Sequence, residues 1–251
     1  MLKKSIIACV AALGALLPCS VDAAELNPHA YALQRFSGYN HGGYARLVNG
    51  QEDLNPSTSC STAVQRPSIN KEMWVILRDD NVATEWIEAG QKKGLQLKDL
   101  SVNGNDTNPQ QIYWGGHFIG RAIFESTTGQ VTFRATPYSN ICPTGSATYQ
   151  IKQTGIDGEW IVYINGNQAL TISNTGYSEA LYIDLGLESK DNLNTFTSGT
   201  YADLWQRLSL SNTWTNVSNS PTAVTDRDAN IYNGMNSTYN SSLNRVTLTH
   251  N

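Results

Sequence analysis

Apolar and polar residues alternate along most of the chain, in short segments separated by residues that favour turns. Alternation with a period of two is typical of β-strands with one buried face. Two such segments, residues 160–164 and 168–172, flank an Asn-Gly-Asn turn at residues 165–167, which is a strong β-hairpin pattern. Helical periodicity is weak, and only at residues 202–208 do we expect a turn or a short helix. The pattern predicts an all-β protein, most simply one antiparallel β-sandwich of the jelly-roll or concanavalin-like kind.

The length of 251 residues suits a single sandwich domain, and no internal repeat or interdomain linker is visible. Hydrophobic residues make up 40% of the chain, enough for a packed core, so intrinsic disorder is excluded as the main state. The part from about residue 211 is rich in Ser, Thr and Asn and ends in an expected strand at residues 245–249. The net charge is −4 and no basic run occurs, so neither nucleic acid nor an anionic membrane is an expected partner. We expect a monomer.

The first residues have the features of an export signal. Two lysines precede an apolar stretch, residues 6–17, that is shorter than the ~20 residues a membrane-spanning helix needs. Val21 and Ala23 are small residues at the two positions that signal peptidase reads. We therefore expect a signal peptide at residues 1–23, and a mature domain at residues 24–251 that is secreted into the extracellular space or the periplasm.

Cleavage after residue 23 leaves two cysteines, Cys60 and Cys142. Two cysteines in an exported protein most often pair with each other, so we expect one structural disulfide. A catalytic thiol is the alternative, but neither cysteine has a histidine nearby in the sequence.

Two of the expected strands carry carboxylates on the face opposite the core. In residues 181–188 the odd positions, from Leu181 to Leu187, are apolar and must face the core, because successive side chains of a strand point to opposite faces. The same rule applied to residues 85–90 turns Ile87 and Ala89 inward. The other face then carries Tyr182, Asp184, Gly186 and Glu188 on one strand and Trp86, Glu88 and Gly90 on the other. If the sheet curves, this face forms a groove with two glutamates, and the glycines leave room for a ligand backbone.

Taken singly, each glutamate is equally explained as a solvated carboxylate on an exposed sheet face, where charged residues are common. The aromatic residues beside them are equally explained as large side chains that shield a sheet. Alternation alone does not show that the two strands meet. The residue pattern therefore indicates a binding groove and leaves its chemistry open.

Short matches in a constant order make the chain similar to the neprosin family of glutamic peptidases. Residues 87–90, Ile-Glu-Ala-Gly, resemble the family's Ile-Glu-Ala-Gly-Trp segment, which holds one catalytic glutamate, and residues 186–188, Gly-Leu-Glu, resemble the Gly-Gly-Glu that holds the second. The other matches, within roughly residues 24–210, are His-Ala-Tyr-Ala at 29–32, Gly-Gly-Tyr-Ala-Arg-Leu at 42–47, Tyr-Trp at 113–114, Gly-Glu-Trp at 158–160 and Ser-Gly at 198–199. Two residues depart from the family pattern, because Gln91 stands where a tryptophan is expected and Leu187 where a glycine is.

The resemblance implies a secreted endopeptidase with Glu88 and Glu188 as the catalytic pair, a polypeptide substrate and a preference for proline sites. Two close carboxyl groups do not both ionise easily, so one keeps its proton. The ionised one takes a proton from the attacking water, and the protonated one polarises the peptide carbonyl or protonates the leaving amine, with a rate maximum at roughly pH 2–5. Neither a metal nor a cofactor is implied. The expected substrate-binding residues are Trp86, Trp114, Tyr182 and Asp184.

Asp184 is either a group that orients one of the glutamates or a plain surface charge. Other catalytic machineries find little support: no His-Glu-x-x-His zinc motif occurs, and residues 176–180 lack the closing glycine of a serine-hydrolase elbow. A glycan-cleaving, glycan-binding or non-catalytic jelly roll is the alternative, since carboxylates and aromatic residues also suit sugars. The sequence does not fit a glycosidase of the laminarinase type, because Tyr182 stands where the first glutamate of the Glu-x-Asp-x-(x)-Glu motif of these enzymes would be. The distinguishing observation is whether Glu88 and Glu188 lie on neighbouring strands, within reach of one water.

Overall fold

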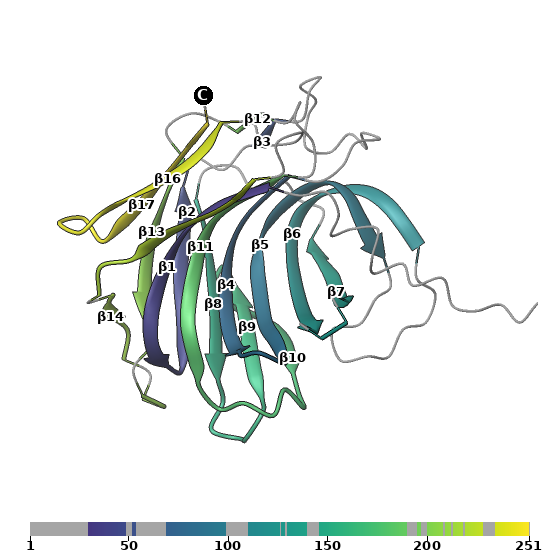
Figure 1. Cartoon of the computed structure of the whole chain (residues 1–251), viewed down its shortest axis with the longest axis vertical. Coiled ribbons are helices and arrows are strands. Elements are labelled where there is room, and N and C mark those ends of the chain that lie inside the picture. Colours follow the sequence, from purple (N-terminus) through teal and green to yellow (C-terminus); the bar gives the residue numbers. More distant parts are fainter. Residues whose placement is uncertain are drawn as a thin grey trace, which may run out of the picture.

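The chain folds into two antiparallel β-sheets packed face to face, which confirms the predicted all-β sandwich (Figure 1). The computed structural model describes residues 30–48, 52–53, 69–98, 110–125, 127–128, 130–139, 146–189, 195–196, 200–207, 209–211, 213–217, 219–227 and 234–250. Every regular element in these ranges is a strand, and none of them contains a helix that could span a membrane. The expected signal peptide and the expected pair Cys60 and Cys142 lie outside the described residues.

Seven strands form the first sheet, which carries both predicted glutamates. In spatial order the strands are β15 (Thr222–Arg227), β1 (Ala30–Asn40), β11 (Ala180–Ser189), β4 (Ile69–Asp79), β5 (Ala83–Lys98), β6 (Gln110–Glu125) and β7 (Gln130–Ser139). All neighbouring pairs are antiparallel. Figure 1 shows β4, β5 and β6 side by side and bending together, so this sheet is curved.

The second sheet covers one face of the first. In spatial order its strands are β10 (Asn167–Ile172), β9 (Trp160–Ile164), β8 (Ala147–Gln153), β2 (Gly42–Val48), β13 (Thr200–Gln206), β17 (Arg245–His250) and β16 (Met235–Asn240). The short strand β14 (Thr215–Asn216) pairs with β13, while β3 (Glu52–Asp53) and β12 (Thr195–Phe196) pair with each other. The chain passes repeatedly from one sheet to the other, as in a jelly roll, and β17 confirms the strand expected near the end of the chain.

The hydrophobic core lies between the two sheets and is filled by alternate residues of each strand. Five residues predicted to face inward are fully buried in it, namely Ile87, Ala89, Ile183, Leu185 and Leu187. Burying one such Ile or Leu side chain contributes about 1.5–3 kcal/mol. Because alternation fixes the inward residues of β5 and β11, it also turns Glu88 and Asp184 to the opposite, outer face of the first sheet.

A smaller apolar cluster lies on that outer face, made of Leu33, Trp74, Ile76 and Tyr182. Leu181 was predicted to face the core and instead packs, half-buried, against this outer cluster. The prediction for Leu181 was wrong because the pairing of β11 with β1 shifts register at this end, between Ser37 and Asn40. Such a bulge interrupts the strict alternation of sides along a strand.

The predicted hairpin is confirmed between β9 and β10, where Asn165 and Gly166 both have positive φ, 51° and 79°. Two positive φ values in a row are the geometry of a type I′ turn, which asparagine and glycine adopt most easily. The other local prediction was wrong, since residues 200–206 form a strand and no helix. Ala202 and Leu204 face the core, and between them the buried Asp203 binds arginines from both neighbouring strands, a pairing that the local sequence does not reveal.

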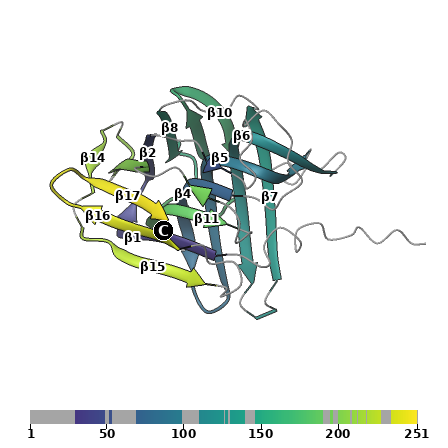
Figure 2. The same cartoon turned by 90° about the horizontal axis from the view of Figure 1, so that it is seen from above.

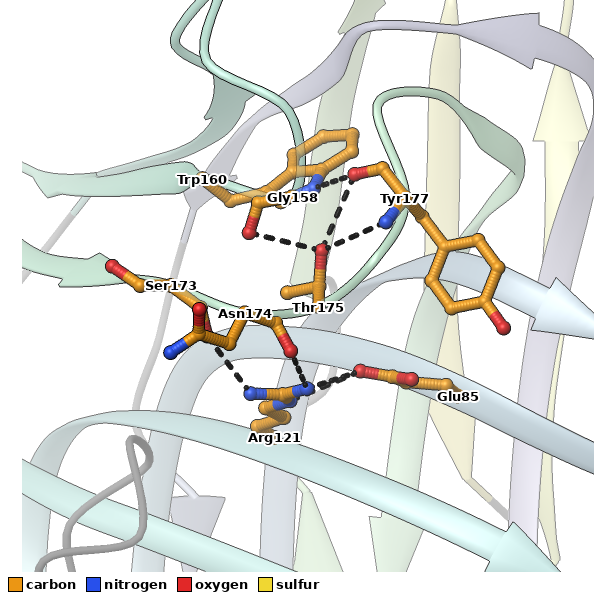
Figure 3. Close-up of polar contacts among 8 residues, drawn as sticks. All are labelled: Glu85, Arg121, Gly158, Trp160, Ser173, Asn174, Thr175 and Tyr177. Atoms are coloured by element: carbon orange, nitrogen blue, oxygen red, sulfur yellow. Dashed lines mark hydrogen bonds and ion pairs between the residues drawn. The ribbon is translucent and has the colours of Figure 1, made fainter.

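Polar side chains tie the two sheets together at one end of the sandwich (Figure 3). Arg121 of β6 donates to Glu85 Oε1 of β5 at 2.8 Å, and to the carbonyl oxygens of Ser173 and Asn174 at 3.2 and 3.1 Å. These carbonyls belong to the segment that connects β10 to β11. The same segment is fixed to β9, because Trp160 Nε1 donates to the carbonyl of Tyr177 at 2.8 Å.

A second link lies where β16 packs against β1, and Figure 2 shows the β16–β17 hairpin beside β1. Gln34 of β1 is buried and donates to the backbone carbonyl of Ser237 at 2.8 Å. The first sheet is thus anchored to the second on both sides of β11, β4 and β5. These three strands carry the candidate site.

Candidate active site

Glu88 and Glu188 do not lie on neighbouring strands, since β4 runs between β5 and β11. Glu88 is level with Trp74 of β4, whereas Glu188 is level with Asn70, four residues away along that strand. Two strand spacings and four residues put their Cα atoms roughly 17 Å apart. Glu88 and Glu188 therefore do not meet the condition set from the sequence, which was that they lie on neighbouring strands within reach of one water.

A third glutamate, Glu72 of β4, lies between them on the same face. Its backbone is level with Gly90 of β5 and with Gly186 of β11. Glu72 is therefore the diagonal neighbour of Glu88 on one side and of Glu188 on the other, a relation that spans about 7–8 Å in an antiparallel sheet. We call Glu88, Glu72 and Glu188 the glutamate row.

Gly90 leaves space for Glu72, whereas a Cβ atom on Gly186 would lie 2.5 Å from Cβ of Leu33 in β1. A Cβ atom on Gly90 would lie 2.5 Å from Cβ of Glu72 and 2.3 Å from the carbonyl oxygen of Lys71. On the other side of β5, a Cβ on Gly120 would lie 2.6 Å from Glu88 Oε1, so the Glu88 carboxyl lies over Gly120. We predicted that Gly90 and Gly186 leave room for a ligand. For Gly90 the contacts show a different role, because its missing side chain makes room for Glu72.

Glu88 and Glu188 each accept a hydrogen bond from a neutral donor. Trp86 Nε1 donates to Glu88 Oε2 at 2.9 Å, and Asn70 Nδ2 donates to Glu188 Oε2 at 2.8 Å. Glu88 is only 3% exposed, whereas Glu188 is partly exposed. A hydrogen-bond donor favours the charged form of a carboxyl group, so these bonds favour ionised Glu88 and Glu188. Because Glu188 is partly exposed and Glu88 is buried, a substrate can reach Glu188 but not Glu88.

Glu72 is in a different environment. It is 0% exposed, and neither of its carboxyl oxygens accepts a hydrogen bond from a donor among the described residues. Its carboxyl is within hydrogen-bonding reach of the Glu188 carboxyl, and two carboxyl groups can share a hydrogen bond only when one of them carries a proton. Burial first, and then the negative charges of Glu88 and Glu188, raise the pKa of Glu72 well above its ordinary value.

A buried lysine, Lys92, opposes this shift. Lys92 of β5 is 1% exposed, and its charge lowers the pKa of Glu72 by less than burial and the two carboxylates raise it. Its Nζ lies 5.5 Å from the centre of the Phe118 ring and 5.6 Å from that of Phe133. The aromatic faces stabilise the ammonium group in this buried position.

Asp184 neither orients a glutamate nor is a surface charge, so both interpretations of it were wrong. It is 2% exposed and binds Arg35 of β1 through both oxygens, at 3.0 and 2.7 Å. Burial raises the pKa of Asp184, and Arg35 opposes the rise. The Arg35 guanidinium also lies 4.0 Å from the centre of the Tyr182 ring, and the Tyr182 hydroxyl donates to Asp79. Tyr182 and Asp184 are thus held by structural contacts beside the row.

The remaining predicted residues have mixed outcomes. Trp86 is on the predicted face and touches Glu88 directly. Trp114 lies in β6 level with Gly94, and its side chain is outside the described part of the structure. Sequence reasoning missed Glu72 and Lys92, although alternation extended back from Trp74 and forward from Gly90 puts both on the outer face.

A cavity of about 520 Å³ lies at one end of the sandwich, away from the row. Its lining includes Tyr39, His41, Arg78, Asp79 and Tyr177, and none of the three glutamates. Among the residues that the structure describes, no three His, Cys, Asp or Glu side chains are grouped so as to hold a metal ion. The cavity has titratable groups of its own, since His41 Nε2 lies 3.5 Å from Glu179 Oε1, but the row differs in having a carboxyl group that is fully buried.

Comparison with known proteins identifies no family. Neither a scan against protein-family models nor a search of curated proteins gives a match. Among solved structures, the chain is similar to the alginate lyase Aly36B, with a TM-score of 0.31 and 11% identity over 70% of this chain and 73% of the lyase. It is also similar to a heptameric SAP-like pentraxin from Limulus polyphemus, with a TM-score of 0.31 and 12% identity over 80% of this chain and 87% of that one.

A further similarity is to the kappa-carrageenase from Pseudoalteromonas carrageenovora, with a TM-score of 0.26 and 9% identity over 87% of this chain and 79% of the carrageenase. At such scores and identities these likenesses carry no argument about what the chain binds or cleaves. The function has to be argued from the glutamate row itself.

Proposed function

We propose that the chain is a secreted glutamic-type endopeptidase in which the glutamate row activates water at acid pH. The observation that carries the proposal is three carboxyl groups on one sheet face, one of them fully buried, with no donor to its oxygens among the described residues, and next to another carboxyl on the adjacent strand. Such a set holds at least one proton where a free glutamate, with a pKa of about 4.3, has lost it. An ionised and a neutral carboxyl side by side are the two groups that acid hydrolysis needs.

The proposed reaction requires no other protein group. An ionised carboxyl takes a proton from water while the water oxygen bonds to the peptide carbonyl carbon, and a neutral carboxyl gives its proton to the amide nitrogen as the C–N bond breaks. One water is consumed, and the protons taken and given balance. Glu188 is the member of the row that meets the substrate, because it is partly exposed while Glu72 and Glu88 are buried.

The choice of a polypeptide substrate rests on the resemblance to neprosin peptidases at residues 87–90 and 186–188. The same resemblance supports cleavage at proline, and the export-signal features of residues 1–23 support secretion, as parts of the proposal. The Glu88 and Glu188 matches both fall in the row, although the row contains a glutamate that the matches do not include.

A glycan-active protein is the second candidate, and one observation favours it. Trp74, Trp86 and Tyr182 lie together on the face that carries the row, and aromatic rings of this kind stack on sugars. The rings are also in contact with one another and with Leu33 and Ile76, which a purely structural cluster requires.

The experiment that separates these candidates offers the purified chain a denatured proline-containing protein and a panel of neutral and acidic polysaccharides at acid pH. Glu188→Gln is assayed in parallel, so that a contaminating hydrolase is recognised by its persistence in that preparation. New peptide termini from the wild type alone support the proposal, and chelator treatment should leave the rate unchanged. Sugar products without peptide products would replace it with the glycan-active candidate.

A further inference from the structure

We propose that the working carboxyl pair is Glu72 with Glu188, and that Glu72 acts through Glu188 as the residue that stores and shares its proton. This inference rests on the proposed function and names the division of roles inside the row. It changes the pair implied by the sequence resemblance, in which Glu88 is the partner of Glu188. Glu88 becomes the negative charge that keeps the proton within the pair.

Contacts distinguish the two possible partners of Glu188. The Glu72 carboxyl is within hydrogen-bonding reach of Glu188, on the adjacent strand. Glu88 is two strands away, and its carboxyl lies over Gly120, toward β6 and away from β4. A proton passes directly between two groups only when they are hydrogen-bonded, so Glu72 is the member that can exchange a proton with Glu188.

Within the described residues, Glu72 lacks the arginine contacts that hold three other buried carboxylates. Glu85, Asp184 and Asp203 are each bound by arginine side chains. Neither oxygen of Glu72 accepts a bond from a donor in the described structure. An ionised carboxylate without donors in a fully buried site is costly, and the neutral form avoids the cost.

The charges that face Glu72 favour the same state. From β5 come Glu88 and Lys92, and from β11 come Glu188 and Asp184, whose charge is neutralised by Arg35 of β1. Within β4, the residues on the same face at either side are Asn70 and Trp74, which carry no charge. Among these described groups, the charges of Glu88 and Glu188 each oppose the ionisation of Glu72 more strongly than Lys92 favours it.

The proton path follows from these contacts. Glu188, ionised while Glu72 holds the shared proton, takes a proton from the attacking water as the water oxygen bonds to the carbonyl carbon. When the C–N bond breaks, Glu188 gives that proton to the leaving nitrogen, and Glu188 again shares the proton of Glu72, which is the starting state. Glu72 has no exposed surface, so it does not touch the substrate and is a positioning residue.

Two variants test the assignment because the alternative pairs predict opposite results. If Glu72 is the partner, Glu72→Gln lowers the rate at the optimum at least about a hundredfold, the scale of general acid–base catalysis, and removes the falling limb of the pH profile. Glu88→Gln then lowers the rate less than about tenfold and moves the falling limb to lower pH, since a nearby negative charge no longer holds the proton. If Glu88 is the partner, the two variants exchange these behaviours, and that result overturns the inference.

A second measurement does not depend on activity. It remains informative if the Glu72→Gln protein folds poorly or if the chain hydrolyses nothing. Infrared spectra of the substrate-free wild type at pH about 6, above the ordinary glutamate pKa of about 4.3, should show the C=O band of a neutral carboxyl. The band should persist in the control Glu125→Gln, which changes an exposed glutamate at the end of β6, and disappear in Glu72→Gln.

The two readouts separate the failure of the inference from the failure of the proposed function. Hydrolysis of polypeptide without the neutral-carboxyl band overturns the Glu72 assignment and leaves the peptidase proposal standing. The band without hydrolysis of any polypeptide supports the proton on Glu72 and removes the peptidase proposal.

Discussion

Glu85 and Glu88 lie on the same strand, β5, on opposite faces of the sheet, and both are largely buried. Glu85 faces the second sheet and accepts two hydrogen bonds from Arg121, at 3.0 and 2.8 Å (Figure 3). Glu88 faces outward, accepts the indole N–H of Trp86 and has Glu72 as its diagonal neighbour. Similar burial thus accompanies opposite electrostatic surroundings on the two faces.

The difference separates structural carboxylates from reactive ones. A carboxylate bound by an arginine is held in place by the ion pair, which a proton transfer would break. Burial raises the pKa of Glu85, and Arg121 opposes the rise. Asp203 repeats the Glu85 arrangement on the second sheet, where Arg46 and Arg245 both bind it. Glu72 has carboxyl neighbours and, among the described residues, no donor to its oxygens, so a proton is favoured there.

The largest expected effect is on catalysis at the exposed end of the row. Glu188→Gln should lower the rate of polypeptide hydrolysis at least about a hundredfold, because glutamine neither ionises nor gives up a proton. Steady-state rates on a denatured protein measure this. Glu125→Gln, an exposed glutamate of the same sheet, is the matched control and should keep the wild-type rate. A Glu188→Gln protein within about tenfold of wild type would remove Glu188 from the reaction.

Gly90→Ala tests the space that Glu72 occupies. The added methyl group would lie 2.3 Å from a backbone oxygen of β4 and 2.5 Å from Cβ of Glu72, and the backbone cannot move away cheaply. We expect the free energy of unfolding to fall by about 1–3 kcal/mol or more, as in overpacked cores. Urea unfolding measures the loss, and an unchanged midpoint would show that the strands are not packed this closely.

Glu85→Gln should affect stability and leave the chemistry in place. Arg121 would lose its charged partner but keep the carbonyls of Ser173 and Asn174, so we expect a loss of about 1–2 kcal/mol in the free energy of unfolding. The rate per folded molecule should equal that of the wild type. A hundredfold loss of rate in a folded Glu85→Gln protein would break the distinction between the two faces.

Alternation along strands predicts much of this molecule but not the composition of the site. It correctly turned Ile87 and Ala89 inward and Glu88 outward, because the face of a side chain depends only on its own strand. It gave no strand order, so β4 between β5 and β11 was not foreseen. Asp184 was misjudged because Arg35, its partner, is 149 positions away. Glu72 was missed because a charged residue beside Lys71 looks like the polar start of a strand.

The smallest expected effect is on the pH dependence of stability. Because the pKa of Glu72 is raised on folding, the folded state holds its proton more tightly than the unfolded state. Its contribution to stability is complete below the ordinary glutamate pKa of about 4.3 and is lost as pH rises through the folded pKa. Glu72→Gln removes this loss, so its stability relative to wild type should increase with pH. A difference that does not change between acid and neutral pH would mean that Glu72 ionises normally.

The most direct test of the account is the pH profile of polypeptide hydrolysis by the wild type. A row that works with one ionised and one neutral carboxyl gives a bell-shaped profile with its maximum on the acid side. Since the pKa of Glu72 is raised, the falling limb should lie above pH about 4.3, where a free glutamate has already lost its proton. An optimum at about pH 7–9, where carboxyl groups are normally ionised, would contradict a proton-sharing row as the catalytic centre.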